Sequence, residues 1–501
     1  MGILSATYLI LLIIVVRALS QFSSTTIKWY LEPMFLVSCV WIFGFLLYSL
    51  PIFTYREEIT LVATIFIVIA HTAFFLGTLC GGALFSAAPS NKCIGVPNER
   101  LSKPFAYSFR VMLAVGLLGL LGLCAVAVDG LLSSGLSLGD RLGEGGLQSV
   151  RIETFSKAAG EISNGPFERF EQFVATAFLY IGMLLNFRFK DISTGKQKVL
   201  ILLGLISGAL IIFNQLLIRG GRMDLVTLSL FVVFAITLDP HCRARIVLAG
   251  FMARHRVFLL TVLMPLVGGV IFYLAVVFVQ GRSGQVSPLD ALHSYHRMGL
   301  TPLVGGLVEG VPVLETLMLS LSYFVVPLDT LSYYFGLSDA AFSGPYWGQY
   351  NFSYLSGFIL RRLDMASEWK MFWEIRGEVW ASLAMHGYGT NVWATLLRDL
   401  AIDFGWLGAV IGMFLLGRIS KWLALEAVVN RDPVIIAAYA FTAVFLIFSF
   451  AHSMFFISSV FPPFVYGMLL YFFTRIRLRG VHENSRAATL VRDTKVAQFT
   501  K

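Results

Sequence analysis

Charged residues are scarce in this chain. Only 13% of its 501 residues are Asp, Glu, Lys or Arg, whereas 57% are hydrophobic. This balance excludes an ordinary soluble globular protein and is typical of a polytopic membrane protein. Apolar runs of about 20 residues, the length a helix needs to cross a bilayer, recur along nearly the whole chain. The sequence therefore predicts one integral membrane domain rather than a soluble domain with an anchor.

Signals for disulfides, metals and cleavage are also missing. The five cysteines are odd in number and form no CxxC pair, so neither a disulfide framework nor a zinc site is indicated. The first apolar run, 3–18, lacks a basic leader and a small-residue cleavage site, and we interpret it as a retained helix. No DxD motif and no cluster of His and carboxylates with ligand spacing occurs on the predicted outer side. We therefore expect no metal and no cofactor.

Positive charge is present in excess, with a formal net charge of +9. Most of the excess lies in short loops and a basic tail, which is the pattern of the positive-inside rule. We interpret it as a topology signal and expect no nucleic acid partner. The basic segments that can face the cytoplasm together are 186–198, 239–256, 417–433 and the tail from Arg475.

The expected fold is an all-α polytopic membrane protein with about eleven transmembrane helices. The predicted spans are 3–19, 33–53, 59–84, 109–134, 169–187, 197–217, 223–238, 256–280, 405–424, 433–455 and 459–474. With the basic loops inside, the protein is expected in a bacterial inner membrane with its amino terminus periplasmic and its carboxyl terminus cytoplasmic.

This topology divides the chain into four parts. Residues 1–281 hold the first eight spans, 282–404 form a large periplasmic loop, 405–474 hold the last three spans, and 475–501 form a basic cytoplasmic tail. The loop is rich in Tyr and Trp, so we expect it to be ordered and to contain amphipathic helices. Its apolar stretch 316–336 is interrupted by Pro327 and Asp329, which favours an interfacial or re-entrant helix over a span.

Two arginines stand at a predicted outer junction. Arg219 and Arg222 flank a glycine pair in "IRGGRMDL", and Arg282 follows the eighth span on the same side. They could be simple interfacial anchors, but basic anchors are disfavoured outside. A guanidinium group matches phosphate oxygens in a bidentate manner. We interpret Arg219, Arg222 and Arg282 as a site for the pyrophosphate of a lipid-linked ligand.

A second element is "HGYGTNVWATLLRDLAIDFGWLGAVIGMFLLG", residues 386–417. Thr390 or Asn391 can cap an amphipathic helix that runs to about Asp403 at the outer surface, before the following run enters the bilayer. The charged residues of this helix are expected to pair with one another: Arg398, Asp399 and Asp403.

Together these elements give a family resemblance. A helix starting at Asn-Val, an acidic-Phe-Gly turn and a Gly-x-x-x-Gly-rich span after a long outer loop resemble bacterial O-antigen and exopolysaccharide repeat-unit polymerases of the Wzy type. "RGGRMDL" is similar to the arginine-glycine element of that family, although the family's paired Arg-x-Gly loop repeats are not evident. The match covers about 211–424. The resemblance implies a metal-independent glycosyltransferase, structurally related to O-antigen ligases, that joins undecaprenyl-pyrophosphate-linked oligosaccharides.

Candidate residues for that chemistry lie in the outer loop. The acceptor hydroxyl needs a general base if the anomeric centre inverts. Candidates for the base are His386, Glu374, His293 and His296, and Arg398 joins the catalytic set. Candidates for sugar binding are Tyr346, Trp347, Trp373 and Asn391. The competing interpretations are ordinary hydrogen-bonded residues for the histidines and an interfacial aromatic belt for the rings.

Other functions stay open from the residues alone. A ligase-like glycan transferase would share the arginines and the loop but use another acceptor. A flippase or transporter should show repeat symmetry and charges inside the spans, whereas the spans 33–53, 59–84 and 256–280 are nearly free of charge. The arginine cluster argues weakly against an inactive scaffold. Whether a chain-length regulator binds the spans is also left open.

Overall fold

The computed structural model describes residues 31–55, 59–87, 287–296, 298–336, 345–352, 395–430 and 433–451. Single residues and short pieces in the ranges 117–128, 199–238, 375–385 and 464–469 are described as well. The elements are α2 (Pro33–Ser49), β1 (Phe53–Thr54), α3 (Leu61–Ala87), α14 (Pro288–His296), β2 (Gly299–Leu300), α15 (Pro302–Val308), α16 (Pro312–Ser322), α17 (Val326–Gly336), α20 (Leu396–Asn430) and α21 (Pro433–Phe448).

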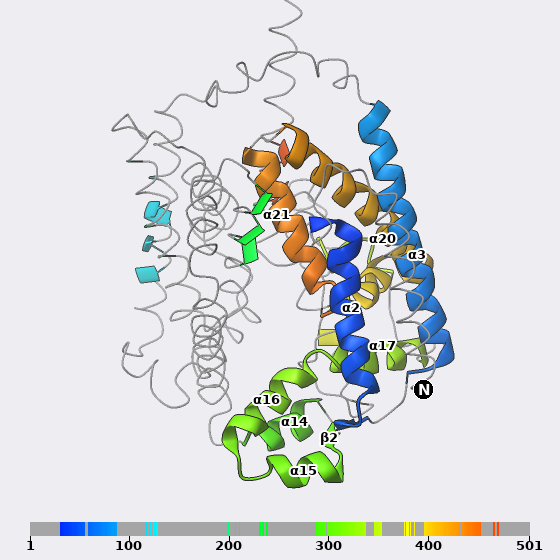
Figure 1. Ribbon diagram of the computed structural model, residues 1–501, viewed down its shortest axis with the longest axis vertical. Helices are drawn as coiled ribbons and strands as arrows, with labels where there is room; N and C mark the ends of the chain where they lie inside the picture. Colours follow the sequence, from blue (N-terminus) through cyan, green and yellow to red (C-terminus); the bar gives the residue numbers. More distant parts are fainter. Residues whose placement is uncertain are drawn as a thin grey trace, which may run out of the picture.

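The described part of the chain is mostly helical, as the sequence predicts. Helices α2, α3, α20 and α21 pack together, and the short helices α14 to α16 gather at one end of this group (Figure 1). Three described segments are long and apolar enough to cross a membrane: Leu61–Gly81, Pro312–Tyr334 and Leu396–Val428. The apolar helices α2 and α21 are shorter. The predicted spans 3–19, 109–134, 169–187, 197–217, 223–238, 256–280 and 459–474 lie wholly or largely outside the described residues.

Proline marks the starts of several helices. Pro33, Pro288, Pro302, Pro312 and Pro433 are each the first residue of a helix. This placement suits proline, because amide N–H groups in the first turn have no intrahelical acceptor and proline has no N–H to leave unpaired. The predicted interruption near Pro327 is also a helix start: helix α16 ends at Ser322, and α17 begins at Val326 with Pro327 as its second residue. Pro312–Tyr334 is therefore two helices separated by a turn.

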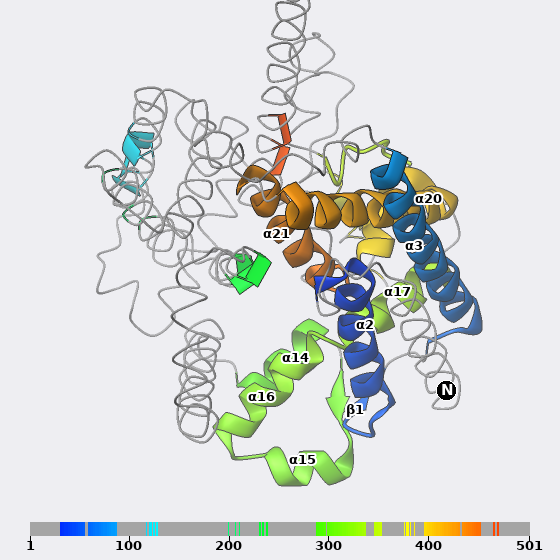
Figure 2. The same ribbon diagram turned by 45° about the horizontal axis from the view of Figure 1, so that its top comes forward.

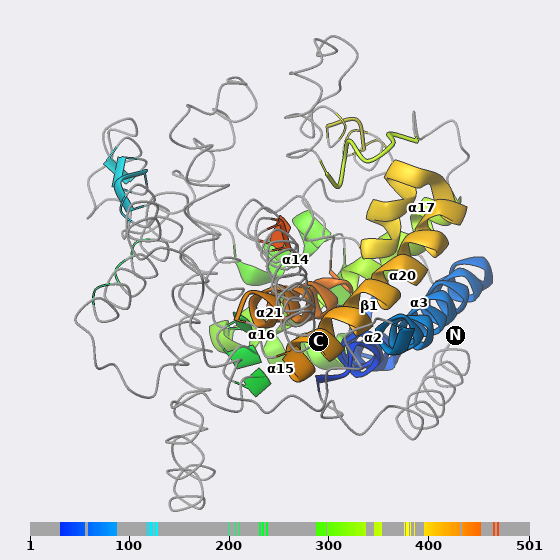
Figure 3. The same cartoon turned by 90° about the horizontal axis from the view of Figure 1, so that it is seen from above.

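The helices α3 and α20 approach each other unusually closely, and α20 runs along α3 when the group is seen from above (Figure 3). A Cβ atom added at Gly77 would collide with the backbone carbonyl of Phe414, and one at Gly417 would collide with that of Phe74. Small residues at such positions let two helix backbones pack in direct contact within a membrane.

Gly77→Ala is therefore expected to lower the thermal stability of the purified protein clearly, because backbone cannot move aside as a flexible side chain can. The matched control is Gly306→Ala in α15, where an added Cβ meets nothing within 4 Å. Alanine has the higher helix propensity, so the control should be neutral or stabilising by up to about 1 kcal/mol. Melting in one detergent compares the two, and equal melting temperatures would contradict the close packing.

Several contacts of helix ends join segments that are far apart in the sequence. Strand β1 pairs with β2 in antiparallel register, with Phe53 opposite Leu300 (Figure 2). The Thr60 amide at the start of α3 donates to the Ser332 hydroxyl of α17 at 2.8 Å. The Leu396 amide at the start of α20 donates to the carbonyl of Ser449, just after α21, at 2.8 Å. The end of α2 and the start of α3 therefore meet the 287–336 segment. The start of α20 and the end of α21 meet each other beside the middle of α2, where Trp41 Nε1 donates to the Ser449 hydroxyl at 3.4 Å.

A buried ion pair joins α20 to the residue that precedes α2. Glu32 lies directly before α2, and both of its carboxylate oxygens accept from Lys421 Nζ of α20, at 2.7 and 2.8 Å. Both residues are buried. The sequence predicts a loop at 417–433. That prediction is wrong for residues 417–430, because α20 continues to Asn430. Lys421 is thus a helical residue whose charge is neutralised.

Candidate functional site

The acidic-Phe-Gly element lies at a break in a helix. Helix α20 is interrupted at Gly405, whose φ of 69° and ψ of 174° are not helical. Glycine suits this position because a side chain disfavours positive φ. The predicted turn between an outer helix and the following span thus corresponds to a real change in the backbone. The predicted cap is wrong, however: the helix begins at Leu396, and Thr395 Oγ1 caps it by accepting from the Arg398 amide at 3.2 Å.

A second segment, 345–352, packs on this break through its backbone. Helix ends leave carbonyl groups without intrahelical donors, and two carbonyls just before Gly405 accept from this segment. The Tyr346 amide donates to the Ile402 carbonyl at 3.3 Å, and the Trp347 amide donates to the Asp403 carbonyl at 2.8 Å. The segment 345–352 therefore supplies donors for two carbonyl groups at the helix break.

The Asp403 side chain holds the same segment. Its carboxylate accepts from the amides of Tyr350 and Asn351, at 2.9 and 2.7 Å, and from Asn351 Nδ2 at 2.7 Å. The same Nδ2 also donates to the Asp399 carbonyl at 2.6 Å. Asp403, Asn351 and Asp399 have no exposed surface. Three N–H groups donate to this one buried carboxyl group, so it clamps the segment 345–352 to α20.

The Arg398 side chain is buried beside this clamp. Its Nε and Nη2 donate to Asp399 Oδ1 at 3.2 and 2.8 Å, and Nη2 lies 3.5 Å from the Tyr350 hydroxyl. The guanidinium carbon is 5.1 Å from the centre of the Tyr334 ring, within cation–π range. The predicted pairing of Arg398 with both aspartates is therefore correct for Asp399 and wrong for Asp403, which the Tyr350–Asn351 backbone occupies instead.

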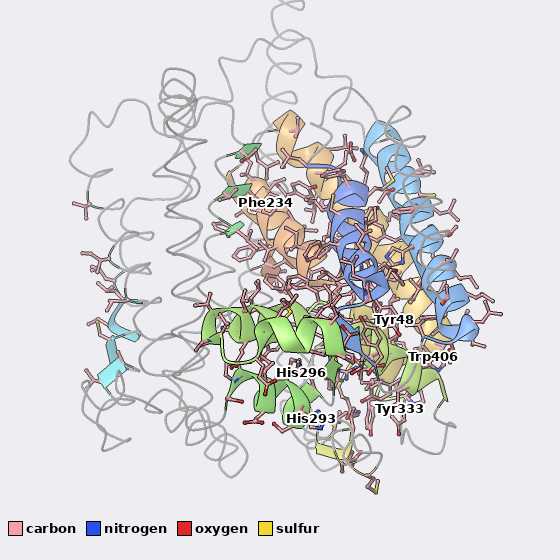
Figure 4. The ribbon with its side chains drawn as sticks, turned by 60° about the horizontal axis from the view of Figure 1, so that its bottom comes forward. Tyr48, Phe234, His293, His296, Tyr333 and Trp406 are labelled. Atoms are coloured by element: carbon pink, nitrogen blue, oxygen red, sulfur yellow. The ribbon has the colours of Figure 1, made fainter. Side chains whose placement is uncertain are left out.

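Two of the predicted sugar-binding aromatics differ in their surroundings. Tyr346 is buried in a cluster that includes Tyr333, with Trp406 packed against the cluster (Figure 4 labels Tyr333 and Trp406). The Tyr346 hydroxyl donates to Glu378 Oε2 at 2.6 Å. Trp347 is 76% exposed and has a φ of 52°. Positive φ is uncommon for a bulky residue and persists only where the surroundings enforce it. The Asp403 clamp thus displays Trp347 outward, while Tyr346 supports the segment from within.

The histidines of α14 have separate environments (Figure 4). His296 is buried, its Nδ1 lies 2.6 Å from the Ser322 hydroxyl, and its ring meets Tyr323 edge to face at 4.7 Å. That environment fits the competing interpretation of a hydrogen-bonded structural histidine. His293 is exposed on the same helix. Neither is hydrogen-bonded to the Arg398 network in the part of the chain that the structure describes.

The remaining candidates lie outside the described residues: Arg219, Arg222, Arg282, Glu374, Trp373, His386 and Asn391. Among the candidates that are described, Arg398, Tyr346 and Trp347 come together at the Gly405 break. No sequence signal pointed to Asn351, because its role depends on contacts with residues about fifty positions away. Among the described residues, no group of three or more His, Cys, Asp or Glu could hold a metal ion.

The chain matches no protein-family model, and comparison with curated proteins and with solved structures finds no significant match. The described residues define a mostly helical chain with three segments long and apolar enough to cross a membrane, and with a buried polar network at a helix break.

Proposed function

We propose that this protein is a membrane glycosyltransferase that polymerises undecaprenyl-pyrophosphate-linked oligosaccharide repeat units at the periplasmic face of the inner membrane. The observation that carries the proposal is the Asp403–Gly405 break. This acidic-Phe-Gly element belongs to the resemblance to Wzy-type polymerases, and it lies where a buried arginine and an exposed tryptophan are held together. A guanidinium beside an aromatic surface is suited to recognising a glycan.

The contacts between helix ends support the predicted grouping of these ends, and the positive-inside pattern then assigns each group a side of the membrane. The positive-inside pattern assigns the β1 turn, the start of α3, the 282–404 loop and the end of α21 to the periplasm. These segments contact one another through β1–β2, Thr60–Ser332 and Leu396–Ser449. The same pattern assigns the start of α2 and the later part of α20 to the cytoplasmic side, and the Glu32–Lys421 pair joins them. We therefore take the Gly405 break as periplasmic.

The proposed reaction has a simple balance. A hydroxyl of the acceptor glycan attacks the anomeric carbon of the donor, and the bond from that carbon to the pyrophosphate oxygen breaks. The lipid pyrophosphate leaves with the electron pair, and the hydroxyl proton passes to a general base, for which His386 and Glu374 are the candidates. Preorganised arginines stabilise the charge that develops on the leaving group, and such electrostatic terms are usually the largest in catalysis. Arg219, Arg222 and Arg282 fill that role in the proposal.

A deletion strain complemented with variants tests this function. Arg219→Ala and Arg222→Ala are each expected to lower polymerisation by about 100-fold, because removal of one charge-stabilising donor has effects of this size. On a gel of surface polysaccharide, the long-chain ladder should disappear while single repeat units remain. Membrane levels of each variant, measured by immunoblot, serve as the control.

The other outcomes separate the alternatives. An unchanged ladder in both variants removes these arginines from the mechanism. Loss of every outward-delivered unit, including single repeats, favours a flippase. Accumulation of full-length lipid-linked polymer that is not attached to its final acceptor favours a ligase.

A further inference from the structure

Two polar atoms of the Gly405 network have no hydrogen-bond partner among the described residues. They are Nη1 of Arg398 and Oδ1 of Asn351. Arg398 is 3% exposed and Asn351 is fully buried. Buried donors and acceptors are almost always paired, because leaving one unpaired costs the hydration that it has lost. One donor and one acceptor in the same network therefore point to a missing polar group.

The rest of each side chain is already bonded, so Nη1 and Oδ1 are the two atoms that still need a hydrogen-bond partner. Arg398 Nε and Nη2 are held by Asp399, and the guanidinium faces the Tyr334 ring. Asn351 Nδ2 is held by the Asp399 carbonyl and the Asp403 carboxylate. Both side chains are thus anchored on the first turns of α20. Such fixed geometry is the preorganisation that a binding site requires.

The charge of the network indicates which kind of group is missing. The network holds one guanidinium, bonded to Asp399, and the carboxyl groups of Asp399 and Asp403, so it carries no net positive charge whether or not Asp403 is protonated. A pyrophosphate would gain little here, because its charge would meet two carboxyl groups. An uncharged hydroxyl can accept from Nη1 and donate to Oδ1 at the same time.

We infer that Arg398 and Asn351 form a subsite for a hydroxyl group of the acceptor sugar, and that the lipid pyrophosphate binds elsewhere. This inference rests on the proposed function and assigns Arg398 to glycan recognition instead of charge stabilisation. Trp347 belongs to the same segment as Asn351 and is exposed, and its amide donates to the Asp403 carbonyl at 2.8 Å.

Binding to the purified full chain in nanodiscs tests the inference with two probes. One is the oligosaccharide repeat unit released from its lipid by mild acid, and the other is undecaprenyl pyrophosphate without sugar. Arg398→Lys keeps a positive charge beside Asp399 but removes the Nη1 donor. It is expected to weaken binding of the released glycan by about tenfold or more, the effect of one lost hydrogen bond to a charged group. Binding of undecaprenyl pyrophosphate should stay unchanged. Arg418→Lys, later in α20, is the matched control and should change neither affinity.

Each result decides something. If the wild type binds neither probe, both the proposed function and the inference that rests on it are overturned. If the wild type binds both and Arg398→Lys binds the glycan normally, the inference alone is overturned and an ordinary buried water completes the network. If Arg398→Lys loses undecaprenyl pyrophosphate instead, Arg398 is an anion site and the inference is again overturned.

Asn351→Ala is the second variant and is expected to lose glycan binding in the same way. Because either substitution could unfold the network, a measurement on the wild-type protein tests the inference independently of the variants. Saturating released glycan is expected to slow hydrogen–deuterium exchange of the amides in 345–352, whereas undecaprenyl pyrophosphate leaves it unchanged. Glycan binding without protection of these amides would overturn the assignment.

Discussion

Asp403→Ala is expected to release the segment 345–352 from α20 and to lower polymerisation by about 100-fold, the size of effect that misplacement of a binding group by about 1 Å can produce. The carboxylate is the shared acceptor for the amides of Tyr350 and Asn351 and for Asn351 Nδ2. Alanine leaves these three buried donors unpaired, at a cost of about 3 kcal/mol or more. Trp347 should then lose its enforced positive φ.

Hydrogen–deuterium exchange measures the release directly, since the Tyr350 and Asn351 amides should exchange much faster in the variant. Asp290→Ala is the matched control. Asp290 is an exposed residue at the start of α14, bonded to the Ser287 hydroxyl at 2.7 Å. The control should change neither exchange in 345–352 nor polymerisation. Unaltered exchange in Asp403→Ala would show that the segment is held by other contacts.

Breaking the Glu32–Lys421 pair is expected to have the second large effect. Lys421→Met leaves the Glu32 carboxylate buried beside an apolar side chain, and Glu32→Gln leaves the Lys421 ammonium without its counter-charge. Removal of one member of a buried pair typically costs about 3–5 kcal/mol, because the remaining charge is uncompensated. Each single variant should therefore unfold much more readily.

The double variant Glu32→Gln with Lys421→Met should recover most of this loss, because no buried charge remains and replacing both partners is often neutral. Unfolding in mixed micelles with increasing sodium dodecyl sulfate gives the four stabilities of the cycle. Additive losses in the double variant would contradict a direct pairing of the two residues.

Local sequence signals predicted several of the described helices. The apolar runs 33–53 and 59–84 correspond to α2 and α3, and Pro327, in the first turn of α17, marked the interruption of 316–336. The Asp-Phe-Gly turn predicted the break at Gly405, because glycine is the residue that tolerates the required φ. These features depend on neighbours in the sequence, so hydrophobic pattern and backbone preference are sufficient to find them.

The long-range contacts could not be predicted in the same way. Lys421 looked like a loop residue because a lysine in an apolar context suggests a span end, but its partner Glu32 is nearly four hundred residues away. Asp403 looked like a partner for Arg398 by helical spacing, yet the backbone of 350–351 occupies it. The network at the break depends on which distant segment packs there, and a single sequence does not encode that choice locally.

Reconstitution tests the central claim most directly. The purified wild-type protein is placed in liposomes with lipid-linked repeat units from the deletion strain, in the presence of EDTA and without sugar nucleotides. The proposed polymerase should convert the single units into a ladder of longer lipid-linked chains and release undecaprenyl pyrophosphate. If the repeat units remain single while they are moved across the bilayer, or remain unchanged, the account of this protein as a metal-independent polymerase is wrong.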